Sequence, residues 1–146
     1  MAARFYDVES NSRLRQRRKL SVFLEQLIKS YRPEVQKIAL SYLFRTDEAL
    51  LQVNRDFLQH DTYTDIITFD LSEKETTLEA EIHVSVDRVA ENARDFKSDY
   101  ETELHRVLFH GALHLAGLKD KTAEESRNMR AAEDAALQQY FNPEKP

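Results

Sequence analysis

The segment EAEIHVSV, residues 79–86, decides the fold because apolar and polar side chains alternate along it. Ala80, Ile82 and Val84 are apolar, whereas their neighbours in the chain are polar or charged. Side chains of a β-strand point to opposite faces in turn, so this alternation predicts a strand with one buried face. Beyond Ser85 the apolar spacing becomes helical, and Ser85 is expected to cap that helix. The inward stripe of the helix is Val86, Val89, Ala90, Ala93 and Phe96.

Three further segments are expected to join the same sheet. TDIITFDL, residues 64–71, is separated from the first segment by the polar turn SEKETT, which predicts a β-hairpin. ARFYDV, residues 3–8, is expected to form a short strand, and VQKIALSYLF, residues 35–44, is rich in strand-forming residues. The sequence therefore predicts a mixed sheet of about four strands.

Helix signals separate and follow these strands. Helices are expected to begin near Ser12, Asp47, Ser85, Asp99 and Thr122. Pro33 ends the first helix, and Thr122 with Glu125 forms the T-x-x-E pattern of a capping box. No repeat or Gly/Ser-rich linker divides the chain, so residues 1–146 are expected to form a single α+β domain with about five helices.

The composition excludes several classes of protein. The chain of 146 residues has no cysteine, which rules out a disulfide framework, a thiolate metal site and a thiol nucleophile. Any metal must therefore be held by His, Asp or Glu side chains. No run approaches the roughly 18 consecutive apolar residues of a membrane span, and the start MAARFYDVES lacks the layout of a signal peptide. We therefore expect a cytoplasmic protein that does not enter a membrane.

The charge is unevenly distributed along the chain. The formal net charge of −5 argues against a protein that coats DNA, because binding many phosphates normally requires a basic surplus. The segment RLRQRRK nevertheless contains five positive residues, which are Arg13, Arg15, Arg17, Arg18 and Lys19. This basic segment is a candidate contact for an RNA backbone, and the alternative is a solvated helix face.

The segment HGALHLAGLKD, residues 110–120, contains both glycines of the chain and a metal-ligand spacing. His110 and His114 are four residues apart in an expected helix, so their imidazoles lie one turn apart on one face. This is the H-x-x-x-H geometry of a zinc hydrolase, although two helix histidines bonded to carbonyls are the alternative. Gly117 suits a sharp turn that brings Asp120 back. The residues thus predict a site with three ligands and an open fourth position.

Gly111 also bears on the chemistry. An interior glycine costs a helix about 1 kcal/mol relative to alanine, so Gly111 suggests close packing of another backbone, or space for the metal and its substrate. In peptidases with the H-E-x-x-H motif a glutamate base stands at this position, so a peptidase is disfavoured and a metal hydrolase remains. Two histidines and one carboxylate also resemble the ligands of non-haem iron oxygenases, which nothing else in the sequence supports.

Three blocks of the sequence match the pattern of one known family. The first block is H-G-x-L-H-L-x-G at residues 110–117, followed by Asp120 where the family has a third histidine. The second, VNRDFLQHDTYTDIITFD, matches through Asn54, Asp61, Thr64, Asp65 and Phe69. The third is EAEIHVSVDRVAENA, residues 79–93. Together these blocks resemble the YbeY family of bacterial endoribonucleases, over most of the chain from residue 53 onward.

The resemblance to the YbeY family implies a zinc-binding α/β fold and a single-strand-specific endoribonuclease. It further implies a role in maturing the small-subunit ribosomal RNA, with ribosomal particles or ribosomal proteins as partners. The metal roles carry over to His110, His114 and Asp120, which would hold one zinc ion. Leu58 stands where the family has an active-site arginine, and Arg55, three residues away, is the candidate to replace it.

Two acidic residues affect the expected chemistry. Asp120 in place of histidine removes one positive charge from a zinc site, which makes bound water less acidic and favours other divalent ions such as Mn²⁺ as well. Glu103 lies on the same helix face as His110 and is a candidate catalytic residue, as a proton acceptor or as a group that orients a ligand. A plain surface glutamate is the alternative. For the whole protein, the alternatives are a non-catalytic ribosome-assembly factor with a structural metal, and a metallopeptidase.

Overall fold

Four strands form one sheet in the part of the chain that the structure describes, which is residues 1–60 and 62–143 of a computed structural model. The strands are β1 (Ala3–Asp7), β2 (Lys37–Arg45), β3 (Ile66–Asp70) and β4 (Thr77–Ser85). Their order in the sheet is β1-β2-β4-β3. Asp61, a residue of the second sequence block, lies outside the described residues.

The sheet is mixed, as the sequence predicts. β1 pairs with β2 and β2 with β4 in parallel, whereas β3 and β4 form the expected antiparallel hairpin. Ala80, Ile82 and Val84 of β4 are buried, which confirms the face assigned from their alternation, but His83 and Ser85 of the opposite face are buried as well. β3 is last in the strand order and is therefore an edge strand. The candidate site described below lies beside it.

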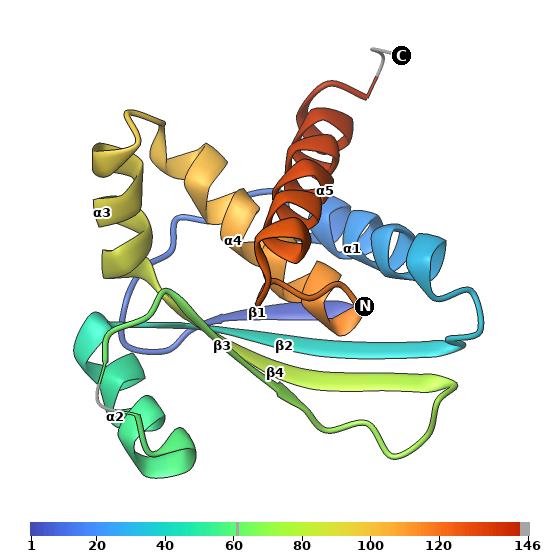
Figure 1. Cartoon of the computed structure of the whole chain (residues 1–146), viewed down its shortest axis with the longest axis horizontal. Helices are drawn as coiled ribbons and strands as arrows, with labels where there is room; N and C mark the ends of the chain where they lie inside the picture. Colours follow the sequence, from blue (N-terminus) through green and yellow to red (C-terminus); the bar gives the residue numbers. More distant parts are fainter. Residues whose placement is uncertain (61, 144–146) are drawn as a thin grey trace.

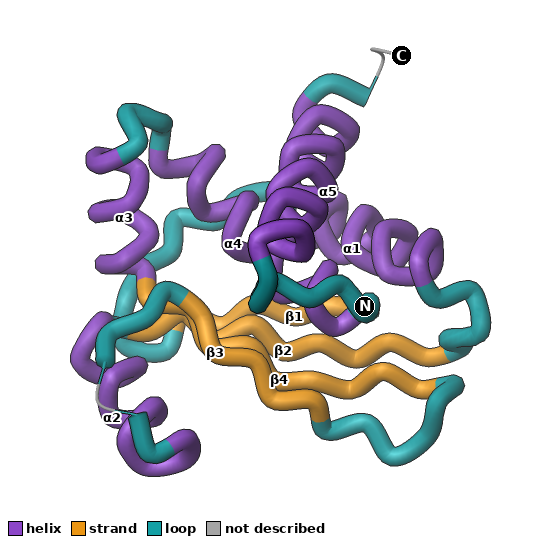
Figure 2. Tube along the Cα trace, viewed as in Figure 1, coloured by secondary structure: helices purple, strands orange, loops and turns teal. Residues whose placement is uncertain are grey.

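Five helices are found in the described ranges, and four of them lie on one side of the sheet (Figures 1 and 2). They are α1 (Arg17–Tyr31), α2 (Asp47–Leu58), α3 (Val86–Asp95), α4 (Tyr100–Leu115) and α5 (Ala123–Phe141). Helix α2 lies on the opposite side, at the end of the sheet where β2 finishes. In the described residues no helix combines the length and the apolar character that crossing a membrane requires.

The first helix begins later than its sequence signal. Ser12 is not its cap: the Ser12 hydroxyl accepts a hydrogen bond from the N–H of Leu14 at 3.2 Å, and the helix starts only at Arg17. Arg13 and Gln16 have positive φ angles of 57° and 55°, so the backbone turns between Ser12 and the helix. A serine hydroxyl that bonds to the backbone two residues ahead stabilises a local turn in place of a helix.

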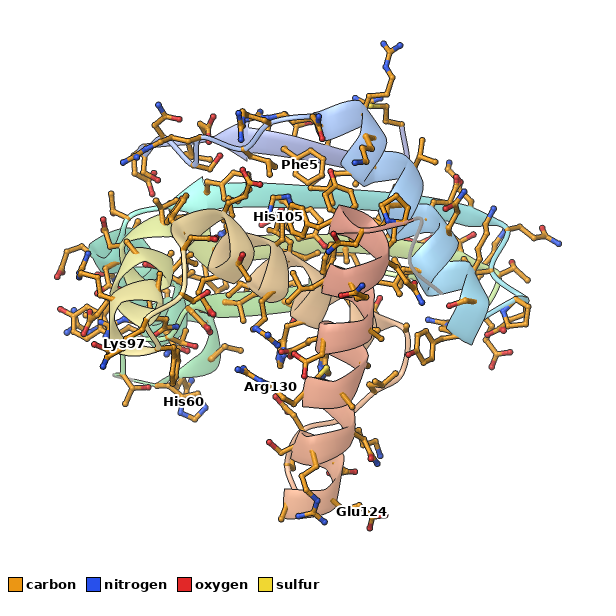
Figure 3. The ribbon with its side chains drawn as sticks, turned by 90° about the horizontal axis from the view of Figure 1, so that it is seen from above. Phe5, His60, Lys97, His105, Glu124 and Arg130 are labelled. Carbon is orange, nitrogen blue, oxygen red and sulfur yellow. The ribbon has the colours of Figure 1, made fainter. Side chains whose placement is uncertain are left out.

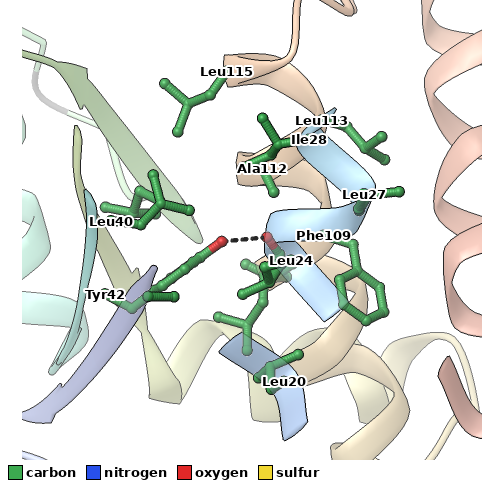
Figure 4. Packing of buried hydrophobic residues seen from close by; sticks show 14 of the residues in the cluster. Leu20, Leu24, Leu27, Ile28, Leu40, Tyr42, Phe109, Ala112, Leu113 and Leu115 are labelled. Carbon is green, nitrogen blue, oxygen red and sulfur yellow. Dashed lines mark hydrogen bonds between the residues drawn. The ribbon is translucent and has the colours of Figure 1, made fainter. Parts of the chain in front are cut away.

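The core lies between the sheet and the covering helices (Figure 4). Leu20, Leu24 and Ile28 of α1 are fully buried there, at the helical spacing seen in the sequence. Tyr42 of β2 is also fully buried, and its hydroxyl donates to the carbonyl oxygen of Leu108 in α4 at 2.9 Å. Burial raises the pKa of Tyr42, so the hydroxyl stays protonated. The hydrogen bond between Tyr42 and Leu108 connects α4 to β2, in the middle of the sheet.

Candidate active site

Helix α4 carries His110 and rests closely on β3. The helix begins at Tyr100 because the side chain of Asp99 accepts a hydrogen bond from the N–H of Thr102 at 2.7 Å. A Cβ atom added at Gly111 would lie 2.9 Å from Cδ1 of Ile66 in β3. Gly111 does allow close packing, as expected, but its close neighbour is the side chain of Ile66 and not another backbone.

A turn after α4 returns Asp120 to His110. Gly117 has a φ of 111°, which side-chain-bearing residues rarely adopt. The N–H of Leu118 donates to the carbonyl of Leu113, and the N–H of Gly117 to that of His114, both at 3.0 Å. These two bonds form a Schellman motif. As a result, Oδ2 of Asp120 lies 3.3 Å from Nε2 of His110, as the sequence spacing predicts.

Glu133 of α5 contacts the other nitrogen of the His110 ring. The buried Glu133 side chain has one oxygen 2.7 Å from Nδ1 of His110 and the other 3.2 Å from Nη1 of Arg106. Because a carboxylate can only accept hydrogen bonds, Nδ1 of His110 carries the hydrogen in the contact with Glu133. The lone pair of neutral His110 is then on Nε2, the atom that faces Asp120.

Two groups of the site have raised pKa values, for different reasons. The hydrogen bond to Glu133 raises the pKa of His110, although burial opposes this shift. Burial raises the pKa of Asp65, and the neighbouring His110 partly counteracts it. Asp65 precedes β3, and its carboxylate accepts a weak hydrogen bond from Nδ2 of Asn92 at 3.5 Å. Perturbed titratable groups that share a cavity mark it as a candidate functional site.

These groups line one cavity, which we call the His110 pocket. Its volume is about 320 Å³, and residues before and within β3, in α3, α4 and α5, and in the loop before α5 contribute to it. The lining residues are Asp65, Ile66, Asn92, Phe96, Glu103, Arg106, Val107, His110, Asp120, Ser126, Met129, Arg130 and Glu133. Four carboxylates thus face two guanidinium groups, and a neutral His110 leaves the lining with a net negative charge.

His114 is not brought into this cluster. Its side chain is exposed and does not line the His110 pocket. Within residues 1–60 and 62–143, no three His, Asp or Glu side chains are placed together so that they could hold a metal ion. The structure thus unites two of the three predicted ligands, His110 and Asp120, and the three-ligand set stays a prediction.

The other predicted site residues have different surroundings. Glu103 is buried in the pocket, so the surface alternative for this residue is wrong. Arg55 is an exposed residue of α2 and is not part of the described pocket lining.

The basic segment lies near the start of α4, and several of its charges have partners. Arg15 pairs with Glu101 and Arg17 with Asp7, both at 2.8 Å. The ammonium group of Lys19 lies 4.6 Å from the centre of the Tyr140 ring. Arg13 likewise lies over Tyr100, 5.7 Å from the centre of its ring. The RNA contact predicted for Arg13, Arg15, Arg17, Arg18 and Lys19 stays a prediction.

Sequence reasoning missed several pocket residues, among them Glu133 and Phe96. Glu133 lies four residues after Met129 and three before Ala136, on the same buried face of α5. A carboxylate on an otherwise apolar stripe is the signal that could have identified it. Phe96 was expected to face inward, yet it is 64% exposed at the pocket. Its position beyond the last residue of α3, Asp95, explains the error, because the helical period does not extend to it.

A family model described as Endoribonuclease YbeY matches residues 6–141. The chain belongs to the YbeY family. The resemblance of the three sequence blocks to YbeY is thereby confirmed, and the match reaches well beyond them into the N-terminal third of the chain.

Individual relatives agree with the YbeY assignment. An Endoribonuclease YbeY from Cytophaga hutchinsonii is 49% identical over 133 residues, which cover 91% of this chain and 92% of the relative. The Endoribonuclease YbeY of Porphyromonas gingivalis is 53% identical over 98 residues, or 67% of this chain and 64% of the relative. The solution structure of TM1509 from Thermotoga maritima has a TM-score of 0.63 at 25% identity, covering 97% of this chain and 90% of that one. The α+β fold with a mixed sheet is thus common to this chain and TM1509.

Proposed function

We propose that this protein is a metal-dependent endoribonuclease that hydrolyses phosphodiester bonds of single-stranded RNA. The observation that carries the proposal is membership of the YbeY family, whose model matches residues 6–141 and whose relatives are named endoribonucleases. The His110 pocket, in which a histidine and an aspartate lie 3.3 Å apart beside arginines, supports this assignment.

We propose that His110, His114 and Asp120 hold one divalent metal ion, zinc or a related ion. The donors fit such an ion, because Nε2 of His110 carries a lone pair and faces the carboxylate of Asp120. His114 is exposed and lies one helical turn from His110, so its side chain can rotate without breaking a buried contact. When bound, a divalent ion activates water and stabilises charge on a phosphoryl oxygen.

The charge of the pocket also supports a cation at this place. Without one, the four carboxylates of the lining outnumber its two guanidinium groups and would repel a phosphodiester. A divalent ion offsets that excess. Arg106 is held by Glu133 and Asp134, whereas Arg130 extends from α5 toward α3 (Figure 3). Arg130 is thus the better placed of the two to contact a phosphate.

The remaining candidates have less direct roles. Glu103 is buried in the pocket, where it can accept a proton or orient a ligand. Arg55 would need RNA bound across α2 to contribute. The basic segment, residues 13–19, can hold an RNA backbone that extends past the start of α4. Ribosomal RNA, bound within ribosomal particles in the cytoplasm, is the substrate we infer from the role of the family.

The test compares cleavage of a labelled single-stranded RNA by the wild type and three variants. We expect a chelator, His110→Ala and Asp120→Ala each to abolish cleavage and to lower the content of bound metal. His60→Ala is the matched control, because His60 is an exposed histidine outside the His110 pocket. A metal-loaded wild type that leaves both single-stranded RNA and ribosomal particles uncut contradicts the nuclease. Metal-dependent co-sedimentation with those particles would then favour an assembly factor.

A further inference from the structure

Phe96 is a large apolar side chain left exposed at the mouth of the His110 pocket. Its exposed fraction is 64%, and it shares the pocket lining with His110 and Asp120. Single exposed apolar residues are common on proteins and need no explanation by themselves. The position of this one, beside the groups proposed to act on RNA, is what gives it meaning.

The backbone holds Phe96 in place at the end of α3. The N–H of Phe96 donates to the carbonyl of Asn92, and that of Ser98 to the carbonyl of Ala93, both at 2.9 Å. Between them, Lys97 adopts a positive φ of 54°, so the helix ends in a Schellman motif like that of α4. A ring on a fixed helix end loses little freedom when a ligand stacks on it, which favours binding.

The ring of Phe96 is open to a ligand, in contrast to that of another exposed aromatic. In the described ranges, no aromatic or cationic group stacks on Phe96. Tyr63, which is also exposed, has the guanidinium carbon of Arg88 5.2 Å from its ring centre. Its hydroxyl also donates to Glu48 at 2.8 Å, so Tyr63 is held by local contacts.

We propose that Phe96 is a stacking platform for one nucleobase of a single-stranded RNA whose backbone enters the His110 pocket. The inference rests on the proposed endoribonuclease function and names a binding site for its substrate. A nucleobase has an apolar face and polar edges. Phe96 offers the ring for the face, and the amide of Asn92 in the same pocket offers a donor and an acceptor for an edge.

The neighbouring polar side chains favour a nucleotide over an apolar ligand. Besides Phe96, the pocket lining includes the polar side chains of Asn92, Ser126 and Arg130, all of which are at least partly exposed. An apolar ligand would cover these groups without bonding them, which is unfavourable. A nucleotide can stack its base on Phe96 while its phosphate accepts hydrogen bonds from Arg130.

The test measures binding of fluorescein-labelled hexa-adenosine by fluorescence anisotropy, with the protein loaded with zinc. We expect Phe96→Ala to weaken binding about 5- to 100-fold, the usual range for loss of one stacked base. Phe96→Trp should bind within about threefold of the wild type, because an aromatic ring is kept. Tyr63→Ala is the matched control and should leave binding unchanged. The thermal unfolding midpoint should be the same for the wild type and both Phe96 variants, since the ring of Phe96 is exposed.

A hexamer of abasic ribose phosphate separates stacking from charge. Phe96→Ala should bind this probe as tightly as the wild type does. Equal weakening for both probes, an unchanged affinity for hexa-adenosine, or no binding of hexa-adenosine by the wild type would each overturn the platform. Gel analysis of the same RNA reports cleavage independently. If Phe96→Ala weakens binding of hexa-adenosine but not of the abasic probe, and no protein cleaves the RNA, then the endoribonuclease proposal is wrong and the stacking proposal stands. If the wild type cleaves the RNA and Phe96→Ala binds hexa-adenosine as tightly as the wild type does, then the stacking proposal is wrong and the endoribonuclease proposal stands.

Discussion

Each ring nitrogen of His110 faces a carboxylate, and the two carboxylates differ in their surroundings. Glu133 is buried and also paired with Arg106, whereas Asp120 is on an exposed loop. The buried contact sets which nitrogen carries the hydrogen, and the exposed one marks where a ligand can enter. Glu133 therefore orients His110 without being placed to touch a bound metal ion itself.

Glu133→Ala should lower the affinity for zinc about 10- to 100-fold, because the ring of His110 loses the group that fixes its orientation. Glu133→Gln should lower the zinc affinity less than Glu133→Ala does, since the glutamine amide oxygen can still accept the hydrogen of Nδ1. Zinc titration by calorimetry measures both effects. Asp134→Asn serves as control: it weakens the contact to Arg106 but leaves the contact between Glu133 and His110. Unaltered affinity in Glu133→Ala would show that His110 is oriented by other contacts.

Single residues differ in how much of their role the sequence reveals. The contact between Asp120 and His110 was predictable, because helical spacing and a glycine turn are local properties of a short segment. The role of Glu133 depends on how α5 packs against α4, which is a tertiary contact. Its place on a buried stripe was visible, but its partner was not. Phe96 lies where a helix ends, and there the periodic pattern no longer indicates the direction of a side chain.

At the scale of elements, the packing of α4 on β3 explains Gly111. A methyl group there would press on Cδ1 of Ile66, the flexible end of a partly buried side chain that can move aside, so the contact offsets much of the helix propensity that alanine adds, and Gly111→Ala should change the free energy of unfolding by less than about 1 kcal/mol. Ile66→Val removes that atom, so Gly111→Ala should be more favourable in the Ile66→Val background than in the wild type. Urea unfolding of the wild type, both single variants and the double variant gives the coupling energy. Additive effects would mean that the two residues do not compete for space.

Helices α3 and α4 end in the same motif with different residues at the left-handed position. Gly117→Ala should destabilise by about 1–2 kcal/mol, because a Cβ is unfavourable at positive φ. Lys97→Gly should instead stabilise by about 0.5 kcal/mol, since relief of the same strain exceeds the entropy cost of glycine in the unfolded chain. Denaturant unfolding tests both changes. Shifts of the same sign in the two variants would contradict this explanation.

The first residue of a helix was predictable wherever the side chain just before it caps the helix. Thr46, Ser85, Asp99 and Thr122 each accept a hydrogen bond from the first turn that follows, as their sequence contexts indicate. Ser12 has the same chemistry, but its hydroxyl bonds within a turn that precedes α1. Residue type alone does not distinguish these two uses of a serine.

At the scale of the whole molecule, the order of the strands was the least predictable feature. The hairpin of β3 and β4 follows from a short turn, whereas β1 and β2 join the sheet through parallel pairs between segments far apart in the chain. Nor does the sequence show that α2 covers the opposite face, against Ile67 of β3. These arrangements leave β3 at the edge beside α4, where the His110 pocket forms.

The junction of α1, α4 and α5 predicts how the stability of the molecule depends on pH. His105 is buried there, its ring stacked 5.3 Å from that of Tyr140, and burial lowers its pKa below the ordinary value of 6.5. The unfolded chain therefore binds a proton more readily than the folded protein does. The contribution of His105 to stability is complete above pH 6.5 and is lost as the pH falls toward the lower pKa of the folded state.

The unfolding free energy of His105→Gln should consequently fall less than that of the wild type when the pH is lowered from 7.5 to 5. The measurements use an ionic strength of about 0.15 M, which screens surface charges. The comparison uses the slope of unfolding free energy against pH, since the substitution also changes packing and so shifts the absolute value. His110 has a raised pKa and therefore an opposite slope, but both proteins retain it and its effect cancels in the difference. Equal slopes for the wild type and His105→Gln would mean that the folded protein accommodates a charged imidazole among these rings.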